Sequence, residues 1–300
     1  MSRIMRSNLI VPSNVKRYLE KAARLAPDTI VLDLEDSIPE PEKDNARQGI
    51  EEAFSIVGAG STPVLVRVNN RPDHLASDMD AAVIPGVSGL LFPKAESADQ
   101  VIWVSDQLAR LEGNRGLEVG EVGLSLEIES PKGLLNLEEI AIASPRVVSM
   151  DIGVEDYCLA LGVSPSKEAS ELLYPLSRMV TVCKAYSIKP LGLLGSLAEF
   201  KDIEKFERSA RGSCQLGCEG AFCIHPDQIP ILNRVFSPDP KKLSWAERVV
   251  EEFEKSLEQG RASTSLDGRM VDEPVYQRAR YFLDQALELT EFVNRKKRAD

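Results

Sequence analysis

The sequence predicts an α/β fold, a (β/α)8 barrel of the TIM type with a C-terminal helical extension. Short apolar runs, which are typical of buried strands, alternate with amphipathic stretches of helical period. This alternation implies right-handed crossovers and a parallel sheet. Eight such strands within roughly 225 residues match a closed barrel. The predicted strands are Ser7–Val11, Thr29–Asp33, Val64–Val68, Gly89–Phe92, Gly123–Ile128, Val147–Ile152, Pro190–Leu194 and Ala221–Ile224.

The stretches between these strands have the apolar spacing of helices that cover a sheet. A doubly wound open sheet is the alternative architecture. No Gly-x-Gly-x-x-Gly follows the first strand, which removes the main reason to prefer that fold. The predicted helices are Val15–Leu25, Lys43–Val57, Ala98–Leu111, Leu134–Ala143, Ser170–Tyr186 and Glu199–Arg211.

The pattern changes after Pro226. One helix follows the last strand, Ser244–Gln259 is predicted as another, and a closing helix begins near Glu273. The segment Gly260–Asp272 between them is rich in Gly, Ser and Thr and lacks periodicity. A flexible segment outside a completed barrel suggests a lid or a contact with a neighbouring subunit. We therefore expect a catalytic barrel over residues 1–236 and a helical extension over 237–300, with the lid at about 260–272.

Composition narrows the class of protein. The chain has 36 Lys and Arg against 47 Asp and Glu, a net charge of −11, which argues against nucleic acid as a partner. The apolar run Leu9–Pro12 is too short for a signal peptide, and no stretch approaches the length of a membrane span. Five scattered cysteines suit reduced thiols better than disulfides. A cytoplasmic protein is expected.

Charged side chains follow several predicted strands. The run Thr29–Asp33 is apolar until its last residue, and Glu35 and Asp36 follow at once. Buried acids are costly unless a cation, a basic partner or solvent compensates them. In a barrel the carboxyl ends of all strands meet at one mouth, so these acids lie near others. The further strand-end residues are Arg67, Asn69, Lys94, Glu127, Glu129, Asp151, Asp156 and His225, whereas Arg6 precedes the first strand.

Glu129 and Asp156 are the candidate metal ligands, although Glu127 shares the strand face of Glu129 and could be a ligand in its place. Glu129 ends its strand before Ser130-Pro131, and Gly153 allows a tight turn that presents Asp156. Two carboxylates without a nearby His or Cys suit a hard ion, Mg²⁺ or alternatively Mn²⁺. The other interpretation is that these acids form ion pairs with Arg67, Lys94 and Lys132.

The basic side chains at the mouth allow more than one role. Arg67 could hold a carboxylate or a developing oxyanion, or it could neutralise Glu35 or Asp36. Lys94 could form a Schiff base, but neighbouring acids would raise its pKa, which favours an ion pair. His225 is expected as a structural cap or core residue, and His74 as a solvated loop residue.

Taken together, several motifs resemble the HpcH/HpaI aldolase–citrate lyase superfamily, in particular its citrate lyase β-subunit-like branch, which includes malyl-CoA and citramalyl-CoA lyases. The motifs occur in family order and span nearly the whole chain. They are Arg6–Pro12, Leu32–Asp36 with Lys43 and Ala46-Arg47, Val66–Asn69, Phe92–Ser97, Ile128–Gly133, Gly153–Asp156, Cys223–Gln228 and Asp267–Asp272.

The resemblance implies a barrel that forms a homotrimer or a hexamer. It implies Mg²⁺ held by Glu129 and Asp156, with Glu35 and Asp36 near the metal-bound water and Arg67. It also implies that a neighbouring subunit's C-terminal segment closes the mouth and contributes Asp272 as acid or base. Contacts with coenzyme A phosphates are implied for Lys43, Arg47 and Arg6. Asp272 could also cap the helix that begins at Glu273.

Two departures from the family pattern concern the acyl partner. Leu161 stands before Gly162 where many relatives have Asp, and the segment Leu191–Leu197 is apolar where relatives have acids. Both changes make this region less polar, which predicts an acyl group that is less polar or bulkier than acetate.

The leading hypothesis is a Mg²⁺-dependent carbon–carbon lyase that cleaves or forms a β-hydroxyacyl-CoA such as malyl-CoA or citramalyl-CoA, with glyoxylate or pyruvate as the keto acid. Arg67 would stabilise the alkoxide, and Asp272 would move a proton at the thioester α-carbon. Alternatives are a citrate lyase β subunit within a multi-subunit complex, a CoA-independent class II hydroxy-keto-acid aldolase, a Schiff-base aldolase using Lys94, and a non-catalytic relative. The sequence leaves the physiological substrates and the direction of the reaction open.

Overall fold

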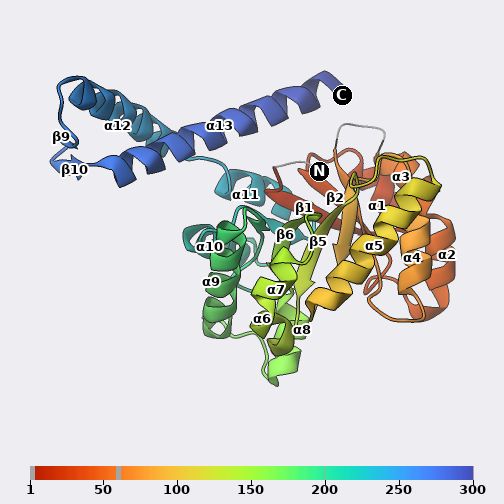
Figure 1. Cartoon of the computed structure of the whole chain (residues 1–300). Helices are drawn as coiled ribbons and strands as arrows, with labels where there is room; N and C mark the ends of the chain where they lie inside the picture. Colours follow the sequence, from red (N-terminus) through yellow and green to blue (C-terminus); the bar gives the residue numbers. More distant parts are fainter. Residues whose placement is uncertain (1–3, 59–61, 199, 300) are drawn as a thin grey trace. The chain divides into compact units, whose positions relative to one another are not determined.

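The structure is a computed structural model that describes residues 4–58, 62–198 and 200–299. The chain divides into two compact units, Met1–Phe236 and Ser237–Asp300. The first unit contains the parallel sheet and the second contains two long helices joined by a hairpin (Figure 1). The two units are described separately.

The first unit is a TIM-type α/β barrel, as predicted. Its eight strands follow the order β7-β6-β5-β4-β3-β2-β1-β8, and every hydrogen-bonded pair is parallel. The strands are β1 (Ser7–Pro12), β2 (Thr29–Asp33), β3 (Val64–Arg67), β4 (Gly89–Phe92), β5 (Gly123–Ile128), β6 (Val147–Ile152), β7 (Lys189–Pro190) and β8 (Ala221–Cys223).

The barrel closes between β7 and β8 through two backbone hydrogen bonds of residues at the end of β7 and just before β8. The amide of Glu219 donates to the carbonyl of Pro190 over 2.8 Å, and the amide of Gly192 donates to the carbonyl of Gly220 over 2.9 Å. On its other edge β7 stays bonded to β6, where Leu191 donates to Met150. Strand β7 is therefore shorter than the predicted Pro190–Leu194, although its continuation still closes the sheet.

Helices alternate with the strands along the chain. The predicted helix Lys43–Val57 is two helices, because Gly49 ends one and begins the next, and Asn136 divides Leu134–Ala143 in the same way. Residue 199, the predicted start of another helix, lies outside the described residues. The helices are α1 (Lys16–Ala22), α2 (Lys43–Gln48), α3 (Ile50–Val57), α4 (Leu75–Ala82), α5 (Ala98–Asn114), α6 (Pro131–Leu135), α7 (Leu137–Ile142), α8 (Val154–Leu161), α9 (Ser170–Ala185), α10 (Ile203–Leu216) and α11 (Gln228–Val235), with a 3-10 turn at Glu40–Glu42.

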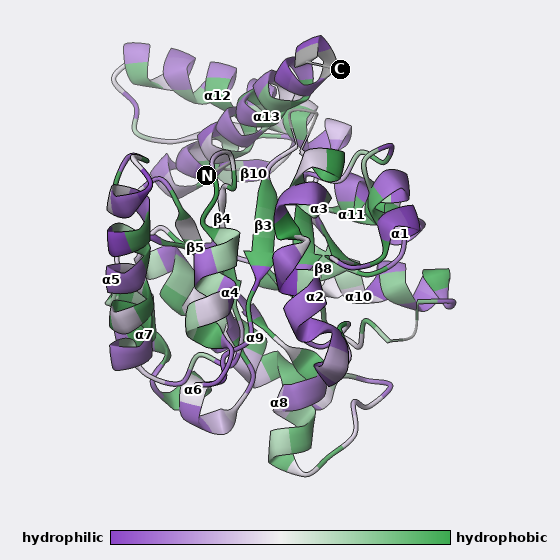
Figure 2. Cartoon of the chain, turned by 90° about the vertical axis from the view of Figure 1, so that its right-hand side faces the viewer, coloured by the Kyte–Doolittle hydropathy of each residue, from purple (hydrophilic) through white to green (hydrophobic). Residues whose placement is uncertain are grey.

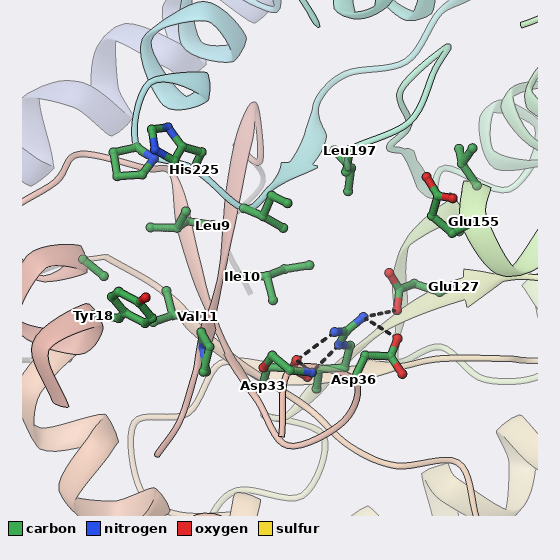
Figure 3. A pocket seen from close by; sticks show the side chains of 18 of the residues that line it. Leu9, Ile10, Val11, Tyr18, Asp33, Asp36, Glu127, Glu155, Leu197 and His225 are labelled. Carbon is green, nitrogen blue, oxygen red and sulfur yellow. Dashed lines mark hydrogen bonds and ion pairs between the residues drawn. The ribbon is translucent and has the colours of Figure 1, made fainter. Parts of the chain in front are cut away.

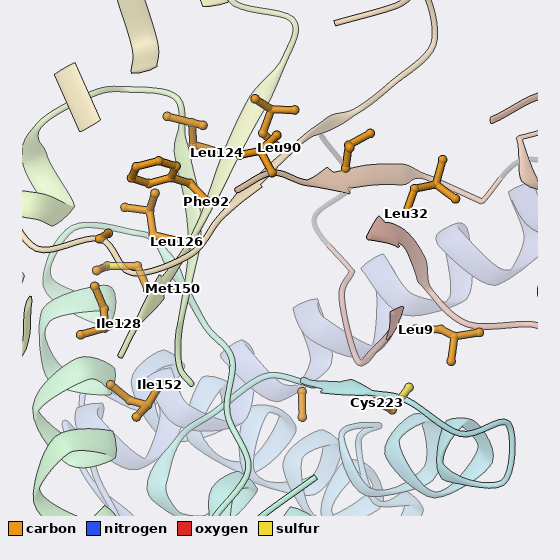
Figure 4. Close-up of a cluster of buried hydrophobic side chains, with 14 of the residues drawn as sticks. Leu9, Leu32, Leu90, Phe92, Leu124, Leu126, Ile128, Met150, Ile152 and Cys223 are labelled. Carbon is orange, nitrogen blue, oxygen red and sulfur yellow. The ribbon is translucent and has the colours of Figure 1, made fainter. Parts of the chain in front are cut away.

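Alternate strand residues point outward and form the apolar layer between sheet and helices. Leu90 and Phe92 of β4 belong to it, as do Leu124, Leu126 and Ile128 of β5 (Figure 4). All five are fully or almost fully buried. The helices complete this layer with their apolar faces and carry hydrophilic residues elsewhere, as the contrast between the hydrophilic α2 and the hydrophobic β3 shows (Figure 2).

The other strand residues point into the barrel. Their lower layer is a small apolar cluster of Met5, Val31, Leu65, Leu91, Leu191 and Phe222. Two residues further along β2 and β3, on the same face, the side chains are Asp33 and Arg67. The strand pattern therefore places a polar layer directly above an apolar floor, on the side of the barrel where the strands end.

The second unit is a helix pair with a two-stranded hairpin between its helices. Helix α12 (Pro240–Glu258) and helix α13 (Glu273–Ala299) pack around Val249, Phe253 and Ala279. The segment that we expected to lack regular structure forms β9 (Thr264–Leu266) and β10 (Arg269–Val271), so that expectation was wrong. Asp267 and Gly268 both have positive φ, as a two-residue hairpin turn requires.

No helix within the described ranges is both long enough and apolar enough to cross a bilayer. None of the five cysteines forms a disulfide in the part of the chain that the structure describes, in agreement with the expected thiols.

The closure between β7 and β8 predicts a strong effect of a methyl group at Gly220. A Cβ atom there would lie 1.9 Å from the carbonyl oxygen of Met5, so the backbone must shift. We expect Gly220→Ala to lower the free energy of unfolding by about 1–3 kcal/mol or more. Gly113→Ala is the matched control, because Gly113 lies in α5 with open space around its Cα. Urea unfolding measures both, and equal stability of the two variants would contradict the prediction.

Candidate active site

Four strands deliver charged side chains to the polar layer inside the barrel. Asp33 and Arg67 are paired residues of β2 and β3, and Glu127 and Asp151 are paired residues of β5 and β6. All four point to the interior because each lies two residues beyond an inward-facing side chain of its own strand. The convergence of strand ends that the sequence predicts therefore places two pairs of neighbours in one layer.

Arg67 lies at the centre of this layer. Its Nε and Nη2 donate to the two oxygens of Asp33 over 2.7 and 2.8 Å. Its Nη1 lies 3.4 Å from Glu35 Oε2, 3.8 Å from Glu127 Oε2 and 3.9 Å from Asp36 Oδ2. Dashed lines join this guanidinium to Asp33, Asp36 and Glu127 in Figure 3. The expected neutralisation of Glu35 or Asp36 is thus secondary to a bidentate pair with Asp33.

The Asp33–Arg67 pair also shapes the loop after β2. The oxygens of Asp33 accept the amide hydrogens of Glu35 and Ser37 over 2.9 and 3.0 Å. Although burial opposes it, Arg67 lowers the pKa of Asp33 below its ordinary value. Burial acts to lower the pKa of Arg67. The facing carboxylates outweigh this effect, so the pKa of Arg67 is raised above its ordinary value. Both groups are therefore charged, and the carboxylate of Asp33 accepts four hydrogen bonds, two from the guanidinium and two from backbone amides.

Lys94 brings together the acids of three different loops. Its ammonium lies 2.6 Å from Glu35, 3.0 Å from Asp156 and 3.5 Å from Glu129. These contacts match the ion-pair interpretation of Lys94. They also place the two candidate metal ligands, Glu129 and Asp156, within 3.5 Å of one nitrogen atom.

Glu129 reaches this position because residue 153 is glycine. A Cβ atom on Gly153 would lie 2.5 Å from Cγ of Glu129 and 2.8 Å from its Oε1. The N-terminus of α8 therefore approaches the end of β5 closely enough for Asp156, in the first turn of α8, to face Glu129. The structure gives Gly153 this second role beside the tight turn that the sequence predicts.

Several acids at the mouth have buried carboxylate oxygens without a hydrogen-bond partner in the described structure. Glu35, Glu127 and Glu129 each have one buried oxygen without a hydrogen-bond partner among the described residues, and so does Asp151. Burial raises the pKa of Glu35 and of Glu129, in spite of the lysine and arginine nearby. Burial and then Glu127 raise the pKa of Asp151. Oxygens of this kind are favourable ligands for a hard divalent cation, so the donor set fits Mg²⁺ or Mn²⁺.

A cavity of about 680 Å³ opens above these groups. Its polar wall contains Asp33, Asp36, Arg67, Glu127, Glu129 and Asp156. The opposite wall is largely apolar, and Figure 3 shows Leu9, Val11 and Tyr18 there, with Ile10 and Leu197 also lining the space. The site can therefore hold a small anion and a cation on one side and an apolar group on the other.

The three residues expected to bind coenzyme A phosphates have partners within the barrel. Lys43 is buried, and its ammonium donates to Asn69 and to the carbonyls of residues 34 and 35. Arg47 pairs with Asp78 over 2.8 Å, and Arg6 pairs with Asp28 over 2.7 Å. None of the three lines the cavity. Contact of these three residues with coenzyme A stays a prediction. Their internal partners and their absence from the cavity wall do not favour it.

Asp272 lies in the second unit, directly before α13. Its Oδ1 accepts the amide hydrogen of Val275 over 3.3 Å, so it caps the helix as the alternative interpretation expects. A capping carboxylate keeps a second oxygen for other contacts, so this role is compatible with proton transfer.

The two histidines differ from each other. His74 is not a solvated loop residue, because its ring lies 2.8 Å from Glu40 and 3.0 Å from Arg47 at the start of α4. His225 lines the cavity, stacks on Phe200 and accepts the amide hydrogen of Asp227. This local bond matches the structural role expected of His225.

Asn70 is a residue of the site that sequence reasoning missed. Its side-chain amide donates to the carbonyls of Pro93 and Lys94, both over 3.0 Å. It thereby ties the loop after β3 to the loop that carries Lys94. The signal available was its position three residues after a strand-end arginine, which alone does not indicate a partner.

The comparisons with known proteins agree with this geometry. The model of the HpcH/HpaI aldolase/citrate lyase family matches residues 6–226. The chain belongs to this family. It is 33 % identical to the citrate lyase subunit beta of Escherichia coli K12, over 95 % of this chain and 94 % of that one. It is 30 % identical to the mitochondrial citramalyl-CoA lyase of Homo sapiens, over 95 % and 86 %.

A solved structure of similar fold is that of the protein CitE from Mycobacterium tuberculosis in complex with magnesium, acetoacetate and coenzyme A. It aligns with a TM-score of 0.69 and 27 % identity, over 93 % of this chain and 97 % of that one. The predicted family and the predicted fold are thus both confirmed.

The buried acids predict an unusual dependence of stability on pH. Burial raises the pKa of Glu127 from 4.5 to about 7. Between these values the folded state keeps a proton that the unfolded state has released, so this contribution to the free energy of unfolding is complete below pH 4.5 and falls as the pH rises to about 7. In the wild type, loss of this contribution should lower the free energy of unfolding by on the order of 1–3 kcal/mol over this range. Glu127→Gln should not show this decrease.

Urea unfolding across this pH range, without divalent ions, measures the effect. Glu20→Gln is the control, because Glu20 is an exposed acid of α1 and should keep the wild-type slope. An unchanged slope in Glu127→Gln would contradict the assignment of this proton.

Proposed function

We propose that the chain is a divalent-metal-dependent carbon–carbon lyase that cleaves or forms a β-hydroxyacyl-CoA, with an α-keto acid such as glyoxylate or pyruvate as the second product or substrate. The relatives with which it shares its family are named lyases of this kind. The observation that carries the proposal is the meeting of Glu35, Glu129 and Asp156 around one cationic atom, beside a fixed arginine.

Glu129 and Asp156 are the proposed ligands of a Mg²⁺ ion, with Glu35 and Asp36 beside its water ligands. Support comes from their oxygen-only chemistry and from the buried oxygens of Glu35 and Glu129 that have no partner in the described structure. Magnesium is also in the name of the similar CitE complex. When bound, the ion supplies Lewis-acid polarisation of the keto acid's carbonyl group.

Arg67 is the proposed donor to the oxygen that gains negative charge when the carbon–carbon bond breaks or forms. Its Nε and Nη2 are held by Asp33, which fixes the plane of the guanidinium. Its Nη1 lies 3.4 Å or more from each facing carboxylate, so it keeps hydrogens for a substrate. A donor fixed before the reaction does not need to reorganise during it, which is the main source of its catalytic effect.

Asp272 is the proposed acid or base at the thioester α-carbon. It directly follows β10, so residues 260–272 present it beside an ordered hairpin rather than on a coil. We propose that this segment is a lid and that it closes the barrel of a neighbouring subunit in a homotrimer or hexamer. A cytoplasmic location agrees with the thiol state of the cysteines.

Coenzyme A is the proposed thioester carrier, as the name of the similar citramalyl-CoA lyase suggests. Arg6, Lys43 and Arg47 remain candidates for its phosphates, although each is engaged within the protein. Lys21 lines the cavity and offers a further cation at its apolar wall.

A second candidate function is that of a citrate lyase β subunit, whose acyl group is carried on a partner protein. The similarity to citrate lyase subunit beta over 95 % of this chain favours it. Activity of the isolated chain on a free CoA thioester would distinguish the leading proposal from this one, and cleavage of free hydroxy-keto acids would indicate a CoA-independent aldolase.

The metal site and the acid–base group can be tested together. We expect the purified chain to cleave malyl-CoA or citramalyl-CoA with Mg²⁺ and to lose this activity in excess chelator. Glu129→Gln and Asp156→Asn should lose both Mg²⁺ binding and activity, whereas Asp272→Asn should keep Mg²⁺ binding and lose about 100-fold or more in kcat. Release of keto acid and calorimetry with Mg²⁺ measure the two properties.

Asp99→Asn is the control for these variants, because Asp99 is exposed in the first turn of α5. Full activity in chelator, or in Glu129→Gln, would overturn the proposal. Full activity in Asp272→Asn would overturn only the role of that residue.

The apolar wall of the cavity predicts the preferred acyl group. Leu197 lines the cavity, whereas Leu161 at the end of α8 does not. We expect propionyl-CoA to exceed acetyl-CoA in kcat/KM for condensation, and Leu197→Ser to reduce this preference by about tenfold because it removes apolar contact. Leu161→Ser is the matched control. A wild-type preference for acetyl-CoA would show that the prediction is wrong.

A further inference from the structure

Lys94 is held in a conformation that lysine rarely adopts. Its φ is 54°, in the left-handed region. This backbone conformation is energetically unfavourable for any residue that carries a side chain. The surrounding loops fix it there: Asn70 donates to the carbonyls of Pro93 and Lys94, and the next amide, that of Ala95, donates to the carbonyl of Glu127 over 3.0 Å. The fold thus maintains an unfavourable backbone that directs this side chain to the acids.

The ammonium of Lys94 lies where the three acids converge. Its distances are 2.6 Å to Glu35 Oε1, 3.0 Å to Asp156 Oδ2 and 3.5 Å to Glu129 Oε2. Buried carboxylates so close together repel each other unless a cation lies between them. Lys94 therefore supplies the positive charge that the proposed metal ion would also supply.

The side chain of Lys94 can leave this position while its backbone stays fixed. It is 42 % exposed, whereas the side chains of Glu35 and Glu129 are 9 % and 6 % exposed. Its four-carbon stem is flexible, and Asp156, which it contacts, lines the adjacent cavity. Glu35 and Glu129 are held in the wall, whereas Asp156 is 38 % exposed, so the ammonium can move away from the two buried acids.

We infer that Lys94 is a built-in competitor of the divalent ion: its ammonium occupies the group of Glu35, Glu129 and Asp156 when the ion is absent and moves toward the cavity when the ion binds. The inference rests on the metal site of the proposed function and adds a residue that sets its affinity. It has two consequences. The acids stay in place before the ion arrives, and the ion is bound less tightly than the number of carboxylates alone would give.

Calorimetric titration with Mg²⁺ alone, at fixed pH and without substrate, tests this inference. Lys94→Gln keeps a polar side chain but removes the charge, and we expect it to bind Mg²⁺ at least about tenfold more tightly than the wild type, because a like charge beside the ion is lost. Lys94→Arg keeps the charge and should stay close to the wild type. Lys132→Gln is the matched control, because Lys132 lies in α6, three residues after Glu129, but pairs with Glu96.

The outcomes separate this inference from the proposed function. Wild-type binding of Mg²⁺ with equal or weaker binding by Lys94→Gln would overturn the competition, and so would a gain of affinity in Lys94→Arg equal to that in Lys94→Gln. A wild type that binds no Mg²⁺ would overturn the metal site itself. Because Lys94→Gln could be unstable without the ion, its thermal unfolding is recorded with and without Mg²⁺, and competition predicts a larger Mg²⁺-induced rise of Tm than in the wild type.

Discussion

The bidentate pair between Asp33 and Arg67 is the interaction on which the rest of the site depends. It joins the ends of β2 and β3 and holds the loop that carries Glu35. An aspartate buried in a barrel is tolerated only because the guanidinium and two backbone amides satisfy it. With this pair in place, one face of Arg67 remains directed at the cavity, and the remaining acids arrange themselves around it and around Lys94.

The mouth of the barrel holds more acids than Arg67 and Lys94 can neutralise. Glu127 and Asp151, neighbours on β5 and β6, have no ammonium or guanidinium within hydrogen-bonding distance among the described residues, and burial raises the pKa of both. An excess of this kind is a poor way to stabilise a fold, since unpaired buried charge costs several kcal/mol. A bound cation would compensate this excess of acids. The same residues would then serve binding at the expense of the stability of the fold.

Much of this arrangement follows from the sequence, and its limits have physical causes. Strand ends converge in any barrel, so the proximity of Arg67, Glu129 and Asp156 could be predicted without coordinates. The partner of Arg67 could not, because residue period alone does not select Asp33 over Glu35. Lys43 was placed at a cofactor because the family resemblance implies it, whereas here its ammonium is buried and donates to three acceptors. The hairpin before Asp272 was missed although Asp267-Gly268 is a known turn signal.

Gly153 and Glu129 are 24 residues apart in the chain, but they share the same space in the fold. Any side chain at 153 would occupy the space of the Glu129 carboxylate, and any shorter residue at 129 would leave a gap that a side chain at 153 could fill. Residue 153 can therefore gain a side chain only where residue 129 has changed. A descendant that acquired alanine at 153 would first have to abandon glutamate at 129, which we propose as a ligand of the ion, so this pair of sites would tell a lyase of this design from a barrel that has been put to another use.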